Sequence, residues 1–426
     1  KLRFVTKPNS AMEDIGRPCQ NPELVKNLHR DIAGAAMRYS ETISIDDLET
    51  DPFPHYARLR AEDPIAPVPA ANCWFATRWS DVEQIARHPD FTALSDEAPV
   101  NTAFGRPNVL TSEGPTHAIL RGGIEPHYKP RRVADYIDAL VRPIAVAQLA
   151  AFRASGSDDL LTEYFEPISA LALARSFGFM EVDTPTLRRW FHGLSQGAIN
   201  FERDPARDAI CQEVSAEIEA VALPLLARLA KTPDNSPLSH MLHSGMEGGE
   251  VRPVEMILPS VKVTLLGGMQ EPGHGAANLL VGLMQNPAQF AALRADIDGL
   301  IGPAIDEALR WIAPIGTMMR TALRDTVVNG IAVPEGTPVS CIFASANRDE
   351  TRWDNADAFD IHRPQKAHMA FGQGTHFCAG KWFAKAQIEV AIRVLLDAFP
   401  QLTFADGPPD FRGWEFRAPT HCRIAL

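Results

Sequence analysis

Residues 371–380 read FGQGTHFCAG and place a cysteine where a thiolate gains stability. Gly372 and Gly374 allow a tight loop, and the helical pattern KWFAKAQIEVAIRVLL follows at once. A thiolate at Cys378 gains from the dipole and the unpaired N–H groups at the start of that helix. The residues alone therefore leave three interpretations open: a metal ligand, a nucleophile that works with His376, or a buried thiol in a capping loop.

Residues 265–275 read LLGGMQEPGHG and interrupt one of the most apolar stretches of the chain. Pro272 has no N–H for the carbonyl four residues earlier, and its ring crowds that carbonyl. We therefore predict a kink or a local widening of the helix. Because violations of local rules concentrate at functional sites, Gln270 and Glu271 become candidates for proton transfer. For His274 we expect a surface or packing role, with a role as a neighbour in the proton relay as the alternative.

The composition limits the classes of partner. The chain has 426 residues, 45% of them hydrophobic, and a net charge of −12. A surplus of acid disfavours nucleic acid and anionic membranes as partners. The apolar runs are too short for a spanning helix, and the first residues lack the apolar stretch of a secretory signal. The six cysteines contain no CxxC pair. We expect a cytoplasmic protein.

The first part of the chain mixes short helices and strands. Helical spacing is seen at 54–62 and 80–87, and strand-like patterns at 65–68 and 73–77. Residues 92–114 are rich in Gly, Pro, Ser and Asn, which predicts a long loop. Long loops in compact domains are often binding loops or lids.

The centre of the chain is helical. From 117 to 300 the apolar spacing is almost wholly that of helices, and the helix that bears the LLGGMQEPGHG segment is predicted to begin near Pro253. Strand-like segments return at 326–333 and 338–343, before a final helix over 382–399.

No linker divides this pattern. We therefore expect a mainly α fold, in which residues 46–426 form a single large helical domain with a small β-rich part. Residues 1–45 have an irregular pattern and are predicted to be an N-terminal extension, only partly ordered.

The string Phe-Gly-x-Gly-x-His-x-Cys-x-Gly at 371–380 resembles the haem-binding loop of the cytochrome P-450 monooxygenases. Glu307 and Arg310, in EALRW, fit that family's Glu-x-x-Arg pair, and Arg363, in FDIHRP, fits the arginine that completes the triad. Alone, the first two would be an ordinary helical pair worth about a few tenths of a kcal/mol. The resemblance implies the cytochrome P-450 fold and a buried structural network beneath the haem.

The resemblance also implies a b-type haem whose iron is bound by Cys378. A thiolate ligand donates electron density to the iron, which favours the activation of oxygen. His376 and Arg320 fit residues that meet the haem propionates, and so do His117 and Arg121 in HAILR.

In this family the long central helix crosses over the haem, and a break in it opens room for dioxygen. Most members have an acid followed by a threonine at the break, whereas this chain has Gln270 followed by Glu271. The resemblance therefore makes these two the candidate catalytic residues. Glu271 is expected to deliver protons and to support some turnover driven by peroxide.

The LLGGMQEPGHG segment is similar in particular to bacterial members that O-demethylate methoxyphenols from lignin, such as guaiacol O-demethylases. FGRP, EVDTPTLRRWF and WEFRAPT extend this similarity. Three aromatic side chains enclose the substrate ring in those relatives, and their positions fall here on Phe104, Ala198 and Phe416. Phe201 is close enough to turn into the space at Ala198. Because an unfilled apolar cavity is costly, a bulkier phenol is expected, with syringol (2,6-dimethoxyphenol) first and guaiacol second.

Five further apolar residues match substrate-lining positions of those relatives, and ordinary core packing is the alternative for each of them. They are Leu110, Val263, Leu266, Gly267 and Ile315.

The reaction implied for syringol gives 3-methoxycatechol and formaldehyde. The chain contains no flavin or iron–sulfur motif, so O₂ chemistry is expected to need a separate NADH-dependent reductase with FAD and an iron–sulfur centre. Three alternatives stay open: a monooxygenase or peroxygenase of another small aromatic such as a 4-alkylguaiacol, a non-catalytic haem-thiolate sensor, and a hydrolase that uses Cys378 and His376.

Overall fold

The predicted strand segments 65–68, 73–77 and 338–343 meet in one five-stranded sheet of order β1-β2-β7-β4-β3, together with two strands that the sequence patterns do not mark, Phe91–Thr92 and Thr317–Ala322. β2 and β7 run parallel and the other neighbours antiparallel, with Trp74 opposite Val339. The strands are β1 Ile65–Val68, β2 Cys73–Ala76, β3 Phe91–Thr92, β4 Thr317–Ala322 and β7 Pro338–Ile342. Two small hairpins add β5 Thr326–Val328 with β6 Ile331–Val333, and β8 Phe411–Arg412 with β9 Ala418–Pro419.

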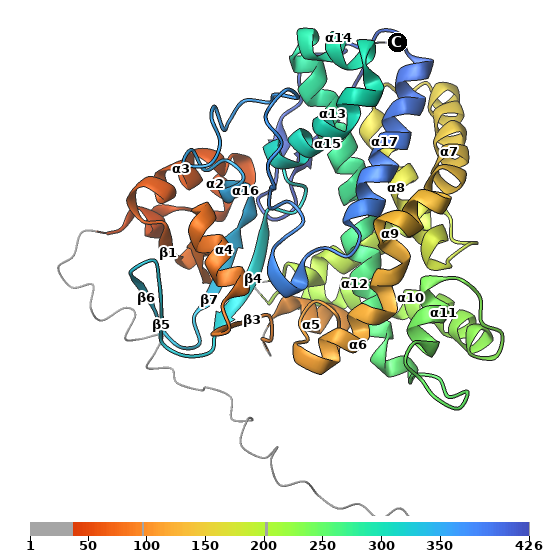
Figure 1. Cartoon of the computed structure of the whole chain (residues 1–426), viewed down its shortest axis with the longest axis horizontal. Coiled ribbons are helices and arrows are strands. Elements are labelled where there is room, and N and C mark those ends of the chain that lie inside the picture. Colours follow the sequence, from red (N-terminus) through yellow and green to blue (C-terminus); the bar gives the residue numbers. More distant parts are fainter. Residues whose placement is uncertain (1–36, 96–97, 201–202, 426) are drawn as a thin grey trace, which may run out of the picture.

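The rest of the molecule is a helical body beside this sheet, as the computed structural model shows (Figure 1). The structure describes residues 37–95, 98–200 and 203–425. The longest helices are α7 Pro130–Ser155, α8 Glu166–Phe177, α9 Thr184–Ala198, α10 Pro205–Lys231, α12 Leu258–Met269, α13 Glu271–Gln285, α15 Ile297–Trp311 and α17 Lys381–Ala398. The shorter ones are α2 Ile45–Thr50, α3 Phe53–Glu62, α4 Trp79–Arg87, α5 Pro99–Phe104, α6 Gly114–Ile124, α11 Pro237–His243, α14 Pro287–Ala295 and α16 Phe343–Ala346. The mainly α architecture with a small β-rich part is confirmed.

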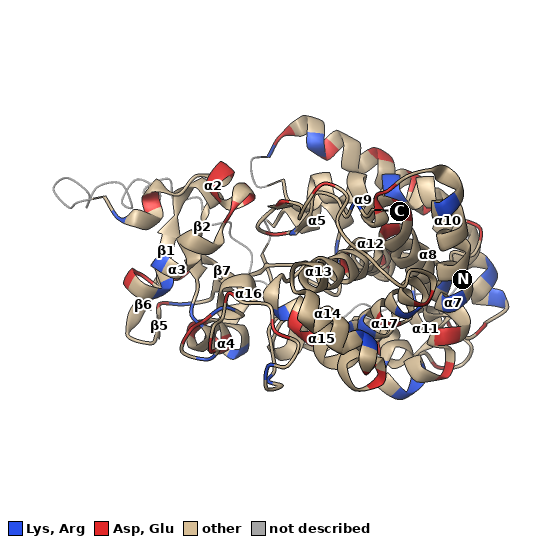
Figure 2. Cartoon of the chain, turned by 90° about the horizontal axis from the view of Figure 1, so that it is seen from above, with Lys and Arg blue, Asp and Glu red and all other residues tan. Residues whose placement is uncertain are grey.

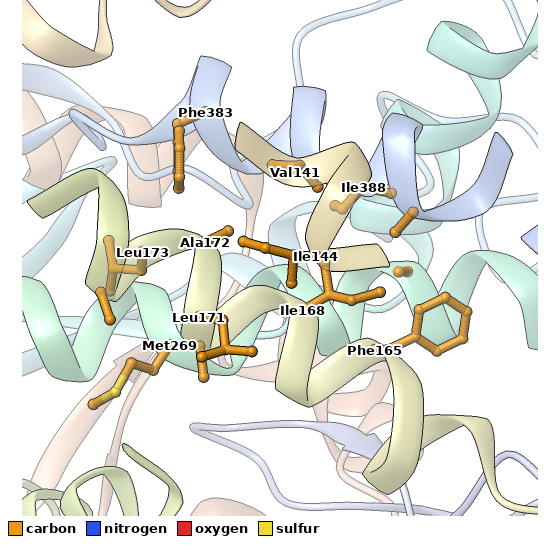
Figure 3. Close-up of a cluster of buried hydrophobic side chains, with 14 of the residues drawn as sticks. Val141, Ile144, Phe165, Ile168, Leu171, Ala172, Leu173, Met269, Phe383 and Ile388 are labelled. Atoms are coloured by element: carbon orange, nitrogen blue, oxygen red, sulfur yellow. The ribbon is translucent and has the colours of Figure 1, made fainter. Parts of the chain in front are cut away.

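The main core lies between the long helices. Side chains of α7, α8, α12 and α17 meet there, as Val141, Leu171, Met269 and Ile388 illustrate (Figure 3). Charged residues of both signs are distributed over the outer elements (Figure 2). In the part of the chain that the structure describes, every helix is too short or too polar to cross a membrane.

The central helix is broken where Pro272 predicts it. α12 ends at Met269 and α13 begins at Glu271, with Gln270 between them. The carbonyl of Gln270 then accepts the first bond of α13, from the N–H of His274 at 2.9 Å. The predicted start near Pro253 is wrong, because residues 254–256 form a separate 3₁₀ turn before α12.

The structure corrects one further expectation, and most of another lies outside the described residues. The segment 92–114 is not a continuous loop, since it contains α5, which begins at Pro99 as a first-turn proline. Residues 1–36 of the predicted extension lie outside the described residues, and the remainder of it forms a 3₁₀ turn over Tyr39–Thr42 and the start of α2.

Candidate functional site

Cys378 lies in a tight loop that leads into α17. Gly372 and Gly374 have φ of +74° and +71°, a conformation that L side chains rarely adopt. A Cβ on Gly374 would lie 2.5 Å from the carbonyl oxygen of Ala86, so this glycine also allows close packing against α4. The N–H of Cys378 donates to the carbonyl of Phe371 at 2.8 Å. The backbone therefore fixes the position of the sulfur.

The thiol of Cys378 is held without a neighbouring base. Burial raises its pKa, while hydrogen bonds from the N–H groups of Gly380 and Lys381 oppose that shift. The helix start thus supplies the amides that the sequence predicts, but burial outweighs them. Because Nε2 of His376 lies 3.3 Å from the carboxylate of Glu113, the geometry does not favour a cysteine–histidine nucleophile.

A cavity of about 270 Å³ lies between this loop and the broken helix. α12 and α13 supply one wall, and α17 and the cysteine loop supply another. Its lining is mainly apolar and includes Leu110, Ile124, Leu173, Val263, Gly267, Pro272, Leu309, Ile315, Met318, Phe343, Phe371, Phe383 and Ile388. A Cβ on Gly267 would meet nothing within 4 Å, so this glycine keeps space open.

The structure brings eight of the predicted site residues to this cavity. They are Leu110, Arg121, Val263, Gly267, Glu271, Ile315, His376 and Cys378. Seven others are not among the described residues that line it: Phe104, His117, Ala198, Leu266, Gln270, Arg320 and Phe416.

Five of these residues were predicted to act at the substrate or in proton transfer. Phe104 ends α5 and Ala198 ends α9, and both are buried, as are Leu266 and Gln270. The ring of Phe416 packs edge-on against Phe191 in α9. Their predicted direct roles at the substrate stay predictions, and Phe201 lies outside the described residues.

Glu271 is a buried carboxyl in the cavity wall. Its Oε2 accepts the N–H of Gln270 at 3.2 Å, whereas Oε1 has no hydrogen-bond partner among the described residues. Burial raises the pKa of Glu271 to about 7. A carboxyl with such a pKa both gives and takes protons near neutral pH.

A group of basic side chains lies beside the cysteine loop. The rings of His117 and His376 are 4.4 Å apart, and Arg320 is buried close to the same carboxylate as His376. Nε2 of His117 and Nη2 of Arg320 have no partner among the described residues. Arg121 donates to the carbonyl of Phe377 at 2.5 Å. Unpaired buried donors of this kind indicate room for an acidic group.

The carboxylate of Glu113 lies among these basic side chains, and no pattern in the sequence singles it out. Its Oε1 accepts the N–H of Ala93 at 2.8 Å and lies close to His376. Burial opposes ionisation, but the hydrogen bonds from His376 and Ala93 prevail and lower the pKa of Glu113 to about 2. Thr264 was also missed, although it lies one turn before Gly267 on the cavity side of α12.

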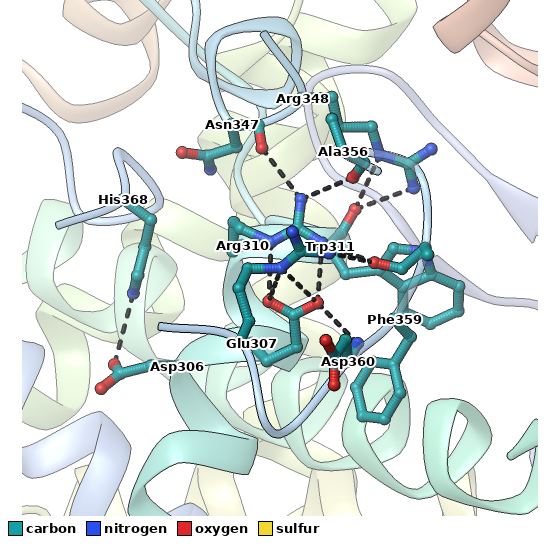
Figure 4. Close-up of polar contacts among 12 residues, drawn as sticks. Asp306, Glu307, Arg310, Trp311, Asn347, Arg348, Ala356, Phe359, Asp360 and His368 are labelled. Atoms are coloured by element: carbon teal, nitrogen blue, oxygen red, sulfur yellow. Dashed lines mark hydrogen bonds and ion pairs between the residues drawn. The ribbon is translucent and has the colours of Figure 1, made fainter. Parts of the chain in front are cut away.

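Glu307 joins two arginines in a buried network (Figure 4). Arg310 donates to Glu307 at 2.7 and 2.8 Å, and Nε of Arg363 lies 3.2 Å from the same carboxylate. Arg310 also donates to the carbonyls of Asn347 and Ala356. The network therefore ties α15 to the segment that leads to the cysteine loop.

Comparisons with known proteins agree with this arrangement. The family model described as Cytochrome P450 matches residues 253–416, which include the broken helix and the cysteine loop. Cytochrome P450 107B1 of Saccharopolyspora erythraea is 29% identical over 397 residues, which cover 88% of this chain and 94% of that protein. The chain belongs to the cytochrome P450 family.

Further P450s are similar over comparable lengths. Pulcherriminic acid synthase of Bacillus subtilis is 26% identical over 363 residues, or 83% of this chain and 89% of that protein. The crystal structure of the myxobacterial cytochrome P450 CYP267B1 in complex with myristic acid has a TM-score of 0.79 and 25% identity, and the match covers 91% of this chain and 99% of that one. This P450 is accordingly an oxidoreductase whose cofactor is a haem with an axial cysteine thiolate.

The residues at the cavity fit that cofactor. Among the described cysteines, Cys378 is the one in the cavity wall. The unpaired donors of His117 and Arg320 suit the two propionates, and Gly267 leaves open space above the loop. The site therefore offers a sulfur ligand, cations and an apolar enclosure in one place.

Proposed function

We propose that this P450 removes methyl groups from small methoxyphenols, with syringol as the preferred substrate and guaiacol as a second one. The products from syringol are 3-methoxycatechol and formaldehyde. The observation that carries the proposal is the mainly apolar cavity with Cys378 in one wall and, in another, Glu271, the one carboxyl among its described lining residues.

The lining supports a neutral aromatic substrate. Leu110, Val263 and Ile315 present apolar surface, and burial of a ring against such side chains is favourable. Thr264 and Thr317 add hydroxyls to the wall. The basic side chains at the cavity, Arg121 and His376, are the ones assigned here to the haem propionates. A carboxylate on the substrate would therefore lack a partner in the apolar region.

The haem, when bound, supplies the chemistry that inserts one oxygen atom of O₂ into a C–H bond. Within the chain, we assign Cys378 as the iron ligand, and His117, Arg121, Arg320 and His376 as propionate partners. Hydroxylation of the methoxy carbon gives a hemiacetal, which collapses to a phenol and formaldehyde.

Glu271 holds and moves the protons that this reaction consumes. Its carboxyl is in the cavity wall, and its pKa of about 7 suits both protonation states. Gln270 fixes one carboxylate oxygen through its N–H. Turnover driven by hydrogen peroxide is a consequence of the same carboxyl acting as a base.

The electrons come from a redox partner, as in related P450s. We propose a separate NADH-dependent reductase that carries FAD and an iron–sulfur centre. Its identity does not affect the spin-shift readout of the substrate test below, which needs no reductase.

The experiment is a panel of syringol, guaiacol, a 4-alkylguaiacol and a carboxylated methoxyphenol. We expect a low-to-high spin shift and formaldehyde release with syringol, a weaker response with guaiacol, and none with the acid. Absence of both signals with every neutral methoxyphenol would reject the proposal. Spin shift and NADH use with the 4-alkylguaiacol alone would favour the alternative substrate class.

A further inference from the structure

A line of buried polar groups leads away from Glu271 on the side of α13 that faces α8. Glu271 and His274 are one helical turn apart, and both side chains are buried. Oε1 of Glu271 and Nδ1 of His274 each lack a hydrogen-bond partner among the described residues. Buried polar atoms without partners are costly, so this pair is retained at the expense of stability. The expected surface or packing role of His274 does not account for it.

The second nitrogen of His274 contacts another helix. Nε2 lies 3.3 Å from Oε1 of Glu166 in α8, and Oε2 of Glu166 lies 3.6 Å from a guanidinium nitrogen of Arg188 in α9. The exposed fraction of these side chains rises from 10% to 13% to 38%. The line therefore begins at the cavity wall and ends at solvent.

The backbone is shaped to bring these groups together. A Cβ on Gly273 would lie 2.9 Å from the carbonyl oxygen of Phe165 and 3.1 Å from Cα of Glu166, which are backbone atoms that cannot yield. A residue without a side chain is thus required for α13 to approach α8 this closely. The preceding turn, Leu161–Phe165, is a π-helix. π-Helical turns are rare in proteins, and those that occur are often at functional sites.

We propose that His274 and Glu166 form a proton path between Glu271 and the solvent at the surface of α8 and α9. This inference rests on the proton-transfer role of Glu271 proposed above. His274 and Glu166 act through Glu271 and touch neither substrate nor haem, so they are positioning residues for its proton.

The path conserves protons and charge. Glu166 first takes a proton from a hydronium ion at the surface, which leaves water. When Glu271 gives its proton to the cavity, Glu166 passes this proton to Nε2 of His274, and His274 releases its Nδ1 proton to the carboxylate of Glu271. An imidazole suits this task because its two nitrogens can donate and accept at once.

The test measures how fast the carboxyl proton of Glu271 exchanges with solvent. The substrate-free ferric protein is mixed into D₂O at about pH 6, where a group of this pKa is mostly protonated, and the carboxyl band is followed by infrared spectroscopy. Loss of the band in Glu271→Gln assigns it. We expect His274→Phe and Glu166→Gln each to slow the exchange roughly tenfold or more.

The control is Glu163→Gln, a carboxyl on the same surface hollow as Arg188 but off the path. It should exchange like the wild-type protein. Glu166→Asp keeps a carboxylate and should recover most of the exchange rate that Glu166→Gln loses. If Glu166 only held α8 against α13, the exchange rate would not depend on whether residue 166 carries a carboxylate.

Wild-type exchange in both His274→Phe and Glu166→Gln would overturn the path. If His274→Phe fails to fold, the comparison of Glu166→Gln with Glu166→Asp decides. No methoxyphenol is present in this measurement, so its result is independent of the substrate panel.

Discussion

Cys378 owes its place to backbone geometry, because two left-handed glycines and one backbone bond set the sulfur at the cavity. Burial raises the pKa of its thiol and so favours the protonated form. A bound metal cation has the opposite effect, because it favours the thiolate.

Replacement of this sulfur therefore has a spectroscopic consequence. Cys378→Ser should abolish the red-shifted Soret band of the ferrous–CO complex, because that band depends on the thiolate ligand. Cys422→Ala, which removes a buried thiol away from the cavity, should keep it. An unchanged band in Cys378→Ser would contradict the assignment.

Glu271 should also make stability depend on pH. Burial raises the pKa of this carboxyl from the ordinary 4.5 to about 7, so its contribution to folding is fully present below 4.5 and is lost as the pH rises through 7. Glu271→Gln cannot ionise. Its advantage in unfolding free energy over the wild-type protein should grow by on the order of 1–2 kcal/mol between about pH 5.5 and 8.5. Urea denaturation at the two pH values measures this, and a constant difference would contradict the buried carboxyl.

At the scale of elements, the break between α12 and α13 was predictable because Pro272 acts through its own geometry. β4 was not predicted, since its burial pattern lacks strict alternation, and β3 has two residues. α5 is a short helix within a segment of turn-forming residues, so its formation depends on packing against α9 and α12 rather than on local preference.

Gly273→Ala should loosen the contact between α13 and α8. The added Cβ would meet the backbone of Phe165 and Glu166, so the helices must separate, at a cost of roughly 1–3 kcal/mol. Thermal unfolding should show a lower Tm.

The matched control is Gly302→Ala, inside α15, where an added Cβ meets nothing within 4 Å. Helix propensity alone then acts, and we expect a gain of about 0.5–1 kcal/mol. If both variants shifted the Tm equally and in the same direction, the close approach of α13 to α8 would not be the cause of the change in Gly273→Ala.

At the scale of the molecule, Glu307 connects the helical body with the segment before the cysteine loop. Glu307→Gln removes the charge that pairs two buried arginines, and we expect a loss of about 3–5 kcal/mol together with weaker haem retention. Glu389→Gln, which breaks the more exposed pair with Arg393, should cost less than about 1 kcal/mol. Chemical denaturation measures both, and similar values for the two would contradict a structural role of the network.

Much of the site was predictable because its key residues are close in sequence. The cysteine loop and the broken helix each form a local motif, and both reach the cavity. The role of Glu113 could not be predicted from the sequence, because it depends on contacts with Ala93 and His376 that only the folded chain creates. Ala198 and Phe416 were matched by similarity, and since neither is among the described residues of the cavity wall, their roles at the substrate stay predictions.

The parallel pairing of β2 with β7 has a consequence for synthesis on the ribosome. β2 is made early, but its neighbour Val339 emerges only after most of the helical body. Until then the β1–β2 hairpin offers a bare edge, which invites association with other nascent chains. A chain arrested before residue 338 would therefore be prone to aggregate, although most of its helices, with the exception of α16 and α17, have been made.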